Sequence, residues 1–213
     1  MEIVPHKTPL WLKQLHPKRT WDYAETLASE KVIYLSFDDG PIPEVTPWVL
    51  QTLKAFQAKA SFFCIGENLQ KHPEIAKQVL AEEHGLGNHT FHHVNGWKTS
   101  FEDYSKEVTN TESIFEKLNI ETKLFRPPYG KMTSKQADFV FGKEYNIIMW
   151  DVLTKDYNAN LNAEKLLQNS IKATTSGSII VFHDSKKAFK NLTYLLPKYL
   201  QHFSELGYTF KKI

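Results

Sequence analysis

The chain contains little cysteine and no marked excess of charge of either sign. Its 213 residues include a single cysteine, Cys64, so no disulfide can form within the chain. Because Cys64 lies in the apolar stretch Ser61–Ile65, we expect a small buried core residue rather than a nucleophile or a metal ligand. The formal net charge is +2, with acids and bases spread throughout, which gives no basic stripe for nucleic acid and no polybasic patch for a membrane surface.

Long apolar runs and linker-like segments are also missing. The apolar stretch Pro9–Leu12 is interrupted by polar residues, so neither a signal peptide nor a membrane-spanning helix is expected, and a cytoplasmic location is favoured. No low-complexity run or shift in composition divides the chain. We therefore expect one main domain over residues 31–213, preceded by an arm over residues 1–30 that packs its aromatic residues Trp11 and Trp21 against it.

The most distinctive stretch is a short apolar segment that ends in two adjacent carboxylates. Residues 31–37 are typical of a buried strand, and the Gly-Pro pair that follows Asp38 and Asp39 stops it, so both acids lie at its carboxyl end. Adjacent carboxylates repel unless a metal, an arginine or a shared proton compensates their charge. The alternative is structural, with one acid in a turn and the other at a helix N-cap.

Strand-like segments alternate with helical patterns along the rest of the chain. We expect strands at residues 31–37, 60–65, 85–88, 123–125, 146–152, 178–182 and 208–212. We expect helices at residues 44–57, 73–83, 101–118, 134–141, 163–173 and 192–206. This alternation predicts an α/β fold with about seven parallel strands. Chemically unusual residues follow five different strands, which favours a barrel, because a closed sheet brings many strand ends around one mouth.

Two histidines four residues apart follow the third predicted strand. His89 and His93 can point two imidazoles at one ion, whereas His92 is expected to point away. No glutamate follows His89, so this is not the helical zinc-protease motif, and any general base must come from elsewhere. The carboxylate pair supplies a third ligand and leaves one acid free to act as a base on an activated water molecule. A chance cluster of surface histidines is the alternative.

Three further residues at strand ends complete the candidate site. Arg126 is followed by two prolines and can hold a carboxylate by a bidentate contact, although a surface salt bridge would explain it too. Asp156 and His183 each follow a buried strand. A lone histidine is more often a packing or capping residue, but beside a carboxylate it becomes a credible proton donor.

The ordered segments SFDDGP, HTFHH, RPPYG, DVLTKDY and VFHD resemble the five motifs of the polysaccharide deacetylases, carbohydrate esterase family four, the nodulation-type chitooligosaccharide deacetylase homologues. The resemblance spans residues 31–213, which would form the catalytic domain. It implies a distorted barrel and metal-dependent removal of acetyl groups from N-acetylated or O-acetylated sugars or polysaccharides. The expected cofactor is a divalent metal, zinc first, with Co²⁺, Ni²⁺ or Mn²⁺ as alternatives. The expected partner is an acetylated oligo- or polysaccharide.

The resemblance also implies a role for each residue. It makes Asp38 the general base, Asp39, His89 and His93 the metal ligands, Arg126 the residue that holds the base, Tyr129 the source of a backbone amide for the oxyanion, and His183 the general acid oriented by Asp156. Two positions depart from the family pattern and wall the acetyl pocket in relatives. Tyr157 stands where tryptophan is usual and Val181 where leucine is usual. Both keep the wall apolar, so we expect the chemistry to survive and the shape of the pocket to differ.

Other functions fit the sequence less well. Non-haem iron oxygenases also use two histidines and one carboxylate, but that reading leaves Asp38, Asp156 and His183 without roles. A catalytically silent sugar-binding homologue would be expected to have lost ligands, and every position here is filled. Relatives that act on small cyclic amides without a metal are disfavoured by the complete ligand set. The missing export signal conflicts with a cell-wall substrate, which points to an intracellular saccharide or to an export route without a readable signal.

Overall fold

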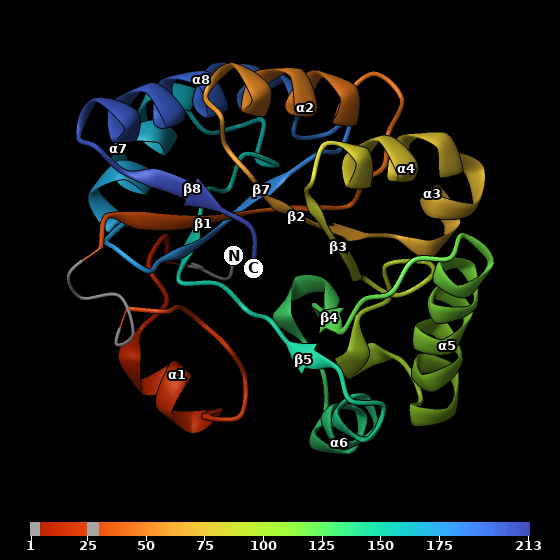
Figure 1. Cartoon of the computed structure of the whole chain (residues 1–213). Helices are drawn as coiled ribbons and strands as arrows, with labels where there is room; N and C mark the ends of the chain where they lie inside the picture. The colour runs from red at the N-terminus through yellow and green to blue at the C-terminus, as the bar shows by residue number, and fades with distance from the viewer. Residues whose placement is uncertain (1–4, 25–29) are drawn as a thin grey trace.

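The computed structural model describes residues 5–24 and 30–213, and its centre is a curled parallel sheet (Figure 1). Within these residues the sheet has eight strands in the order β5-β4-β3-β2-β1-β7-β6, with β8 also paired to β1. The strands are β1 (Val32–Asp38), β2 (Ser61–Cys64), β3 (Gly85–Asn88), β4 (Leu124–Phe125), β5 (Asn146–Ile147), β6 (Val152–Leu153), β7 (Ile179–His183) and β8 (Thr209–Lys211). The predicted α/β fold with a distorted parallel barrel is confirmed.

The helices lie around this sheet. They are α1 (Leu10–Leu15), α2 (Thr46–Ala55), α3 (Gly66–Lys71), α4 (Pro73–Ala81), α5 (Phe101–Lys117), α6 (Ser134–Gly142), α7 (Ala163–Ala173) and α8 (Phe189–Glu205), with the 3-10 helices η1 (Gly96–Lys98) and η2 (Pro128–Gly130). Figure 1 shows α2, α7 and α8 together along one side of the sheet, with α1 and α6 on the opposite side. The sequence pattern predicted neither α1 nor α3, because six residues are too few to show a helical period.

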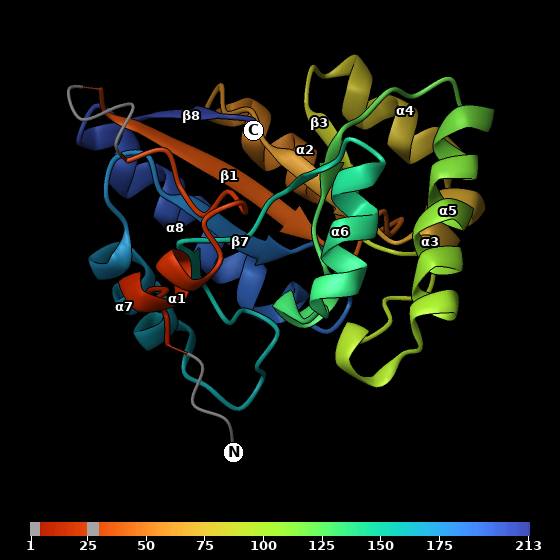
Figure 2. The ribbon, with the colours of Figure 1, turned by 90° about the horizontal axis from the view of Figure 1, so that it is seen from below.

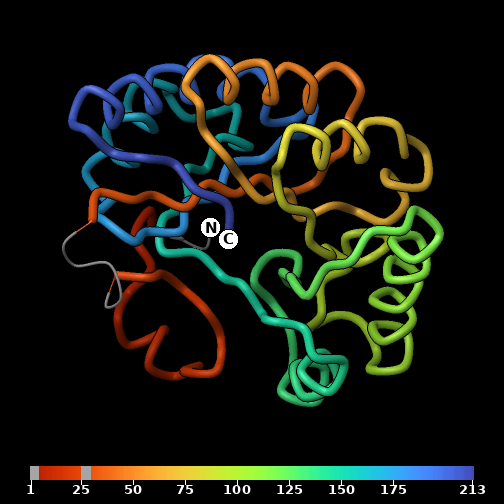
Figure 3. Tube along the Cα trace, in the orientation of Figure 1, coloured from red at the N-terminus to blue at the C-terminus, as the bar shows by residue number. Residues whose placement is uncertain are grey.

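The segment from residue 146 to residue 153 draws the two ends of the sheet together. Its first part, β5, pairs with β4, and its last part, β6, pairs with β7 at the other end of the strand order. In Figure 3 the teal tube of this segment runs between the two ends. The single strand predicted over residues 146–152 is therefore wrong in its middle. There the backbone bonds to the arm instead, since the Thr20 amide donates to Ile147 O (2.9 Å) and the Met149 amide donates to Thr20 O (2.7 Å).

The apolar core explains why the central strands form. Phe37 of β1 stacks on Phe62 of β2 and on Phe182 of β7, with ring centroids 5.0 Å and 5.6 Å apart. All three side chains are buried, as strands covered on both faces require. Cys64 is buried at the end of β2, so its predicted core position is confirmed.

The N-terminal arm contacts the barrel through one of its two tryptophans. Trp21 is buried in a cluster with Phe125 and Met149. Trp11 is 64 % exposed, so the prediction that it packs against the domain is wrong. In the view of Figure 2, α1 and α6 lie on the near side of the sheet. The predicted arm also included residues 1–4 and 25–29, which lie outside the described residues, and its division from the catalytic domain stays a prediction.

None of the helices in residues 5–24 and 30–213 combines the length and the apolar character that crossing a bilayer requires.

Candidate metal centre and active site

Asp38 and Asp39 end β1 with different surroundings. Asp38 continues the strand and is buried, whereas Asp39 has a φ of 87°, a backbone conformation that residues other than glycine seldom adopt. The Asp39 backbone is held from both sides, because its amide donates to Phe63 O (3.2 Å) and its carbonyl accepts from Asn68 Nδ2 (2.8 Å). A cis peptide joins Gly40 and Pro41 directly afterwards. The turn therefore directs the two carboxylates differently.

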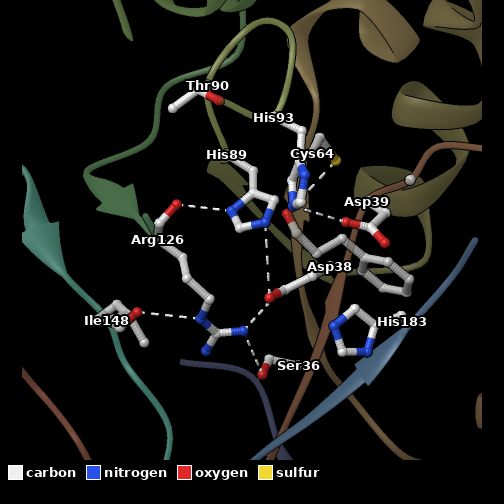
Figure 4. Close-up of polar contacts among 12 residues, drawn as sticks. Ser36, Asp38, Asp39, Cys64, His89, Thr90, His93, Arg126, Ile148 and His183 are labelled. Carbon is white, nitrogen blue, oxygen red and sulfur yellow. Dashed lines mark hydrogen bonds and ion pairs between the residues drawn. The ribbon is translucent and has the colours of Figure 1, made fainter. Parts of the chain in front are cut away.

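His89 and His93 meet Asp39 at the mouth of the barrel. One potential ligand atom from each of the three residues lies within 4.8 Å of the others. The His89 Nδ1 is 2.7 Å from the Arg126 carbonyl, so it carries the proton and donates it, leaving Nε2 with a free lone pair. The His93 Nε2 lies 3.4 Å from Asp39 Oδ1. Figure 4 shows both imidazoles directed towards the two carboxylates.

This cluster has the properties that a divalent cation requires. Asp39 Oδ1 is buried and has no hydrogen-bond partner among the described residues, which is costly unless something else satisfies it. Burial and the neighbouring His93 lower the pKa of His89 far below its usual value. Burial lowers the pKa of His93 despite the attraction of Asp39 and Asp38. Two neutral imidazoles and one carboxylate are a typical ligand set for catalytic zinc, and the donor set fits such an ion.

The charge of Asp38 is compensated by a buried arginine, Arg126. The Arg126 Nη1 donates to Asp38 Oδ1 (2.6 Å) and to Ser36 Oγ (2.8 Å). Its Nε and Nη2 donate to the carbonyls of Ile148 (3.1 Å) and Met149 (2.9 Å), so the guanidinium is fixed in place. The other carboxylate oxygen, Oδ2, faces His89 Nε2 at 3.9 Å. One oxygen is therefore anchored and the other faces the cluster.

Asp156, which is buried, and His183, which is partly exposed, form a second pair across the mouth. The His183 Nδ1 lies 2.8 Å from Asp156 Oδ1, and the His183 amide donates to Asp156 Oδ2 (2.8 Å). Burial lowers the pKa of His183, but the charge and hydrogen bond of Asp156, together with Asp39 and Asp38, outweigh it and raise the pKa to about 9. His183 is therefore protonated at neutral pH, with Nε2 left to act at the cavity.

A cavity of about 270 Å³ joins these groups. It is lined by eight of the ten residues that the sequence singled out, namely Asp38, Asp39, His89, His93, Tyr129, Tyr157, Val181 and His183. The other two, Arg126 and Asp156, are fully buried behind it. The ring of Tyr157 meets the edge of His183, with centroids 4.9 Å apart. His92 instead contacts Glu107 and is exposed, so the expectation that it points away is confirmed.

Sequence reasoning gave no role to several residues that position the site. Ser36 lies two residues before Asp38 on the same face of β1, so strand periodicity is a signal that could have identified it. Asp184 accepts from the Gly40 amide (3.0 Å) and from Thr46 Oγ1 (2.6 Å), which ties β7 to the turn after Asp39. Burial raises the pKa of Asp184 to about 8. Trp150 and Leu153 add apolar wall to the cavity.

The fold and the site together define a barrel hydrolase with a metal-ligand cluster at the carboxyl ends of its strands. Residues 26–140 match the family described as polysaccharide deacetylase. The chain is 35 % identical over 204 residues to a peptidoglycan-N-acetylglucosamine deacetylase of Bacillus cereus, and the match covers 93 % of each protein. The chain therefore belongs to the polysaccharide deacetylase family.

Other relatives agree with this assignment. A chitooligosaccharide deacetylase of Azorhizobium caulinodans is 31 % identical, with 76 % of this chain and 77 % of that protein covered. A solved peptidoglycan N-acetylglucosamine deacetylase, in complex with 4-naphthalen-1-yl-N-oxidanyl-benzamide, has a TM-score of 0.85 at 29 % identity and covers 97 % of this chain and 95 % of that one. Some relatives are longer, and the chain spans 56 % of a second B. cereus deacetylase.

Proposed function

We propose that the protein hydrolyses the acetamido group of N-acetylglucosamine residues in peptidoglycan or chitooligosaccharides, using one divalent metal ion. The observation that carries the proposal is the position of Asp38 beside the Asp39–His89–His93 cluster, with one carboxylate oxygen anchored and the other facing the cluster. The peptidoglycan and chitooligosaccharide deacetylases similar to this chain support the substrate class.

The ion proposed for the cluster is zinc, held by Asp39, His89 and His93. Two histidines and one carboxylate leave a further position open, as in catalytic zinc sites. When bound there, such an ion activates a water molecule and polarises the acetyl carbonyl. Co²⁺, Ni²⁺ and Mn²⁺ are the alternatives to be compared by loading the protein with each.

The chain's own groups supply the proton transfers. We assign the removal of a proton from the attacking water to Asp38, because Arg126 fixes its Oδ1 and leaves Oδ2 facing the cluster. We assign the protonation of the departing amine to His183, whose pKa is raised to about 9 and whose Nδ1 is held by Asp156. His183 thus starts in the protonation state that its role requires at neutral pH.

The backbone amide of Tyr129 is the proposed donor to the oxyanion. No described residue accepts a hydrogen bond from it, and Tyr129 has a φ of 60°, so the turn of η2 is held in an unusual conformation at the cavity. Val181 and Tyr157 line the same cavity, and their apolar surface suits the methyl of an acetyl group better than a charged acyl group.

Release of acetate tests the proposal. Zinc-loaded protein is incubated with N-acetylglucosamine oligomers, peptidoglycan fragments, acetylated xylan and an aryl acetate, and free acetate is measured. We expect acetate from the N-acetylated substrates, abolished by a chelator and by Asp38→Asn. Oxygen consumption with iron and a reductant, without acetate from any substrate, would replace the proposal with an oxygenase function. Binding of oligosaccharide without turnover would indicate a silent homologue.

A further inference from the structure

A second hollow opens beside the active-site cavity, between the N-terminal arm and the segments around η1 and η2. Its volume is about 390 Å³, within the ~300–1,000 Å³ that is typical of ligand clefts. Tyr129, Lys131 and Trp150 line both hollows, so the two adjoin. We call the second hollow the arm groove, and the residues that matter in it are His16, Arg19, Trp97, Tyr129 and Lys131. A glycan with one acetyl group at the metal-ligand cluster has room here for a neighbouring sugar.

Two exposed aromatic rings wall the arm groove. Trp97 is 62 % exposed, yet its indole N–H donates to Met132 O (3.2 Å) and its backbone amide donates to Asn95 Oδ1 (3.0 Å), so the ring is fixed. Tyr129 is 59 % exposed and packs against the ring of His93 at a centroid distance of 4.7 Å. Large aromatic rings held open to solvent are unfavourable in water and provide flat surfaces on which the C–H face of a sugar can pack.

The described residues that line the arm groove carry charge of one sign. No acidic side chain occurs among the described residues that line it, whereas Arg19 and Lys131 are cationic and His16 titrates. The ammonium of Lys131 lies over the Trp97 ring, 4.9 Å from its centroid. Arg19 is half-buried, and its side chain makes no hydrogen bond or ion pair with any described residue. Burial lowers the pKa of its guanidinium, because the charge has lost water without gaining a carboxylate.

The half-buried guanidinium of Arg19, at the wall of an open groove, is suited to bind a carboxylate. Arginine offers two parallel N–H donors that match the two oxygens of a carboxylate, and the contact gains strength where water is partly excluded. The groove lies next to the site where the acetyl group is removed, so the carboxylate would belong to the substrate itself.

We propose that the arm groove binds the sugar next to the one that is deacetylated, and that Arg19 selects substrates in which this neighbour carries a carboxylate. The inference rests on the proposed deacetylase function and narrows its substrate to a peptidoglycan-type glycan. Such strands carry carboxylates on the lactyl ether of muramic acid residues and on their stem peptides, whereas chitooligosaccharides are uncharged. Arg19 is therefore a specificity-determining residue contributed by the arm.

A comparison of substrates tests the role of Arg19. The kcat/KM for acetate release is measured on three substrates, namely N-acetylglucosamine tetramer, peptide-free glycan strands with free lactyl groups, and strands that keep their stem peptides. In Arg19→Gln we expect the ratio of kcat/KM on carboxylate-bearing strands to that on the tetramer to fall about tenfold, the effect of losing one charge-assisted hydrogen bond. Arg19→Lys should recover part of the ratio. If the ratio falls only for the peptide-free strands, Arg19 binds the lactyl carboxylate. If it falls only for the strands with stem peptides, Arg19 binds a carboxylate of the peptide.

Lys18 provides a matched control. It is an exposed cation next in sequence to Arg19, but it does not line the arm groove. Lys18→Gln removes the same charge and should leave the ratio unchanged. Equal effects of Lys18→Gln and Arg19→Gln, or an unchanged ratio in Arg19→Gln, would overturn the inference. Equilibrium binding of both kinds of strand to the metal-loaded protein gives a second readout, in which Arg19→Gln should raise the Kd about tenfold. This readout decides the matter even if no acetate is released, an outcome that would refute only the proposed function.

Discussion

The guanidinium of Arg126 is fully buried and donates to Asp38 Oδ1 at 2.6 Å. A buried pair of this kind is weak support for stability as a whole, but breaking it from one side is costly, because the remaining charge loses its partner without regaining water. We therefore expect Arg126→Met to lower the free energy of unfolding by about 3–5 kcal/mol, measured by denaturant titration of the metal-free protein.

The charge of Asp38 can be separated from the other contacts of Arg126 by a double variant. Arg126→Met/Asp38→Asn removes the stranded carboxylate while losing the same bonds to the carbonyls of Ile148 and Met149. The double variant should therefore be more stable than Arg126→Met alone. If the two variants unfold at the same denaturant concentration, the loss comes from the carbonyl contacts and not from Asp38.

The two adjacent acids should respond differently to substitution. Asp39 Oδ1 is buried without a hydrogen-bond partner among the described residues and faces His93 Nε2, whereas Asp38 already accepts from Arg126. We expect Asp39→Ala to lose the bound metal, and Asp38→Asn to retain about one ion per chain while turnover disappears. Elemental analysis after dialysis, paired with acetate release, distinguishes these outcomes. Equal loss of metal from both variants would contradict the assignment of Asp38 as the base.

The protonation of His183 should set the alkaline limit of activity. Its pKa is raised to about 9, largely through Asp156, so the general acid is protonated below that pH and is lost above it. A cation ligated by Asp39 would offset part of the attraction that this carboxylate exerts, so the alkaline limb of kcat/KM should lie somewhat below 9. Asp156→Asn should move the limb to lower pH. An unmoved limb would show that Asp156 does not stabilise the imidazolium.

The pair formed by His183 and Asp156 should make the stability of the metal-free protein depend on pH. The pKa of His183 in the folded state is higher than the 6.5 of the unfolded chain, so its contribution is fully present below pH 6.5 and is lost as the pH rises through about 9. The Tm of the wild type should therefore fall over this window by more than that of Asp156→Asn. Parallel curves for the two proteins would argue against the raised pKa.

Local patterns were enough to predict most of the site. Asp38, Asp39, His89, His93 and His183 all lie at or just beyond the carboxyl ends of strands, and parallel strands bring these ends to one mouth whatever the details of the loops between them. Which oxygen of Asp38 is anchored could not be predicted, because it depends on how Arg126 crosses the barrel to reach β1.

The two tryptophans of the arm lie in different surroundings that their sequence neighbours do not distinguish. Both Trp11 and Trp21 were predicted to pack against the domain because they are aromatic. Only Trp21 packs in an apolar cluster, because α1 turns Trp11 to the surface. The break in the strand over residues 146–152 was equally hidden, since it arises from hydrogen bonds to Thr20, more than a hundred residues away in the sequence. Contacts at such a distance leave no periodicity in either segment.

The arm is held to the barrel by a buried carboxylate, that of Asp151. Asp151 accepts from Lys7 (2.5 Å), from Lys13 (2.5 Å) and from Ser178 Oγ (2.6 Å). The side chain of Lys7 is 42 % exposed and that of Lys13 is 16 % exposed, so solvent screens the first contact far more than the second. Lys13 also pairs with Asp22, and although burial lowers the pKa of Lys13, the bonds to Asp151 and Asp22 raise it overall.

We expect Lys13→Gln to reduce the free energy of unfolding by about 1–3 kcal/mol and Lys7→Gln by about 0–1 kcal/mol, measured in one buffer by denaturant titration. Because the arm groove includes residues of the arm, Lys13→Gln should also weaken binding of glycan strands, whereas Lys7→Gln serves as the control of equal charge. Equal destabilisation by the two variants would mean that the ion pairs with Asp151 do not differ in strength as their exposure requires.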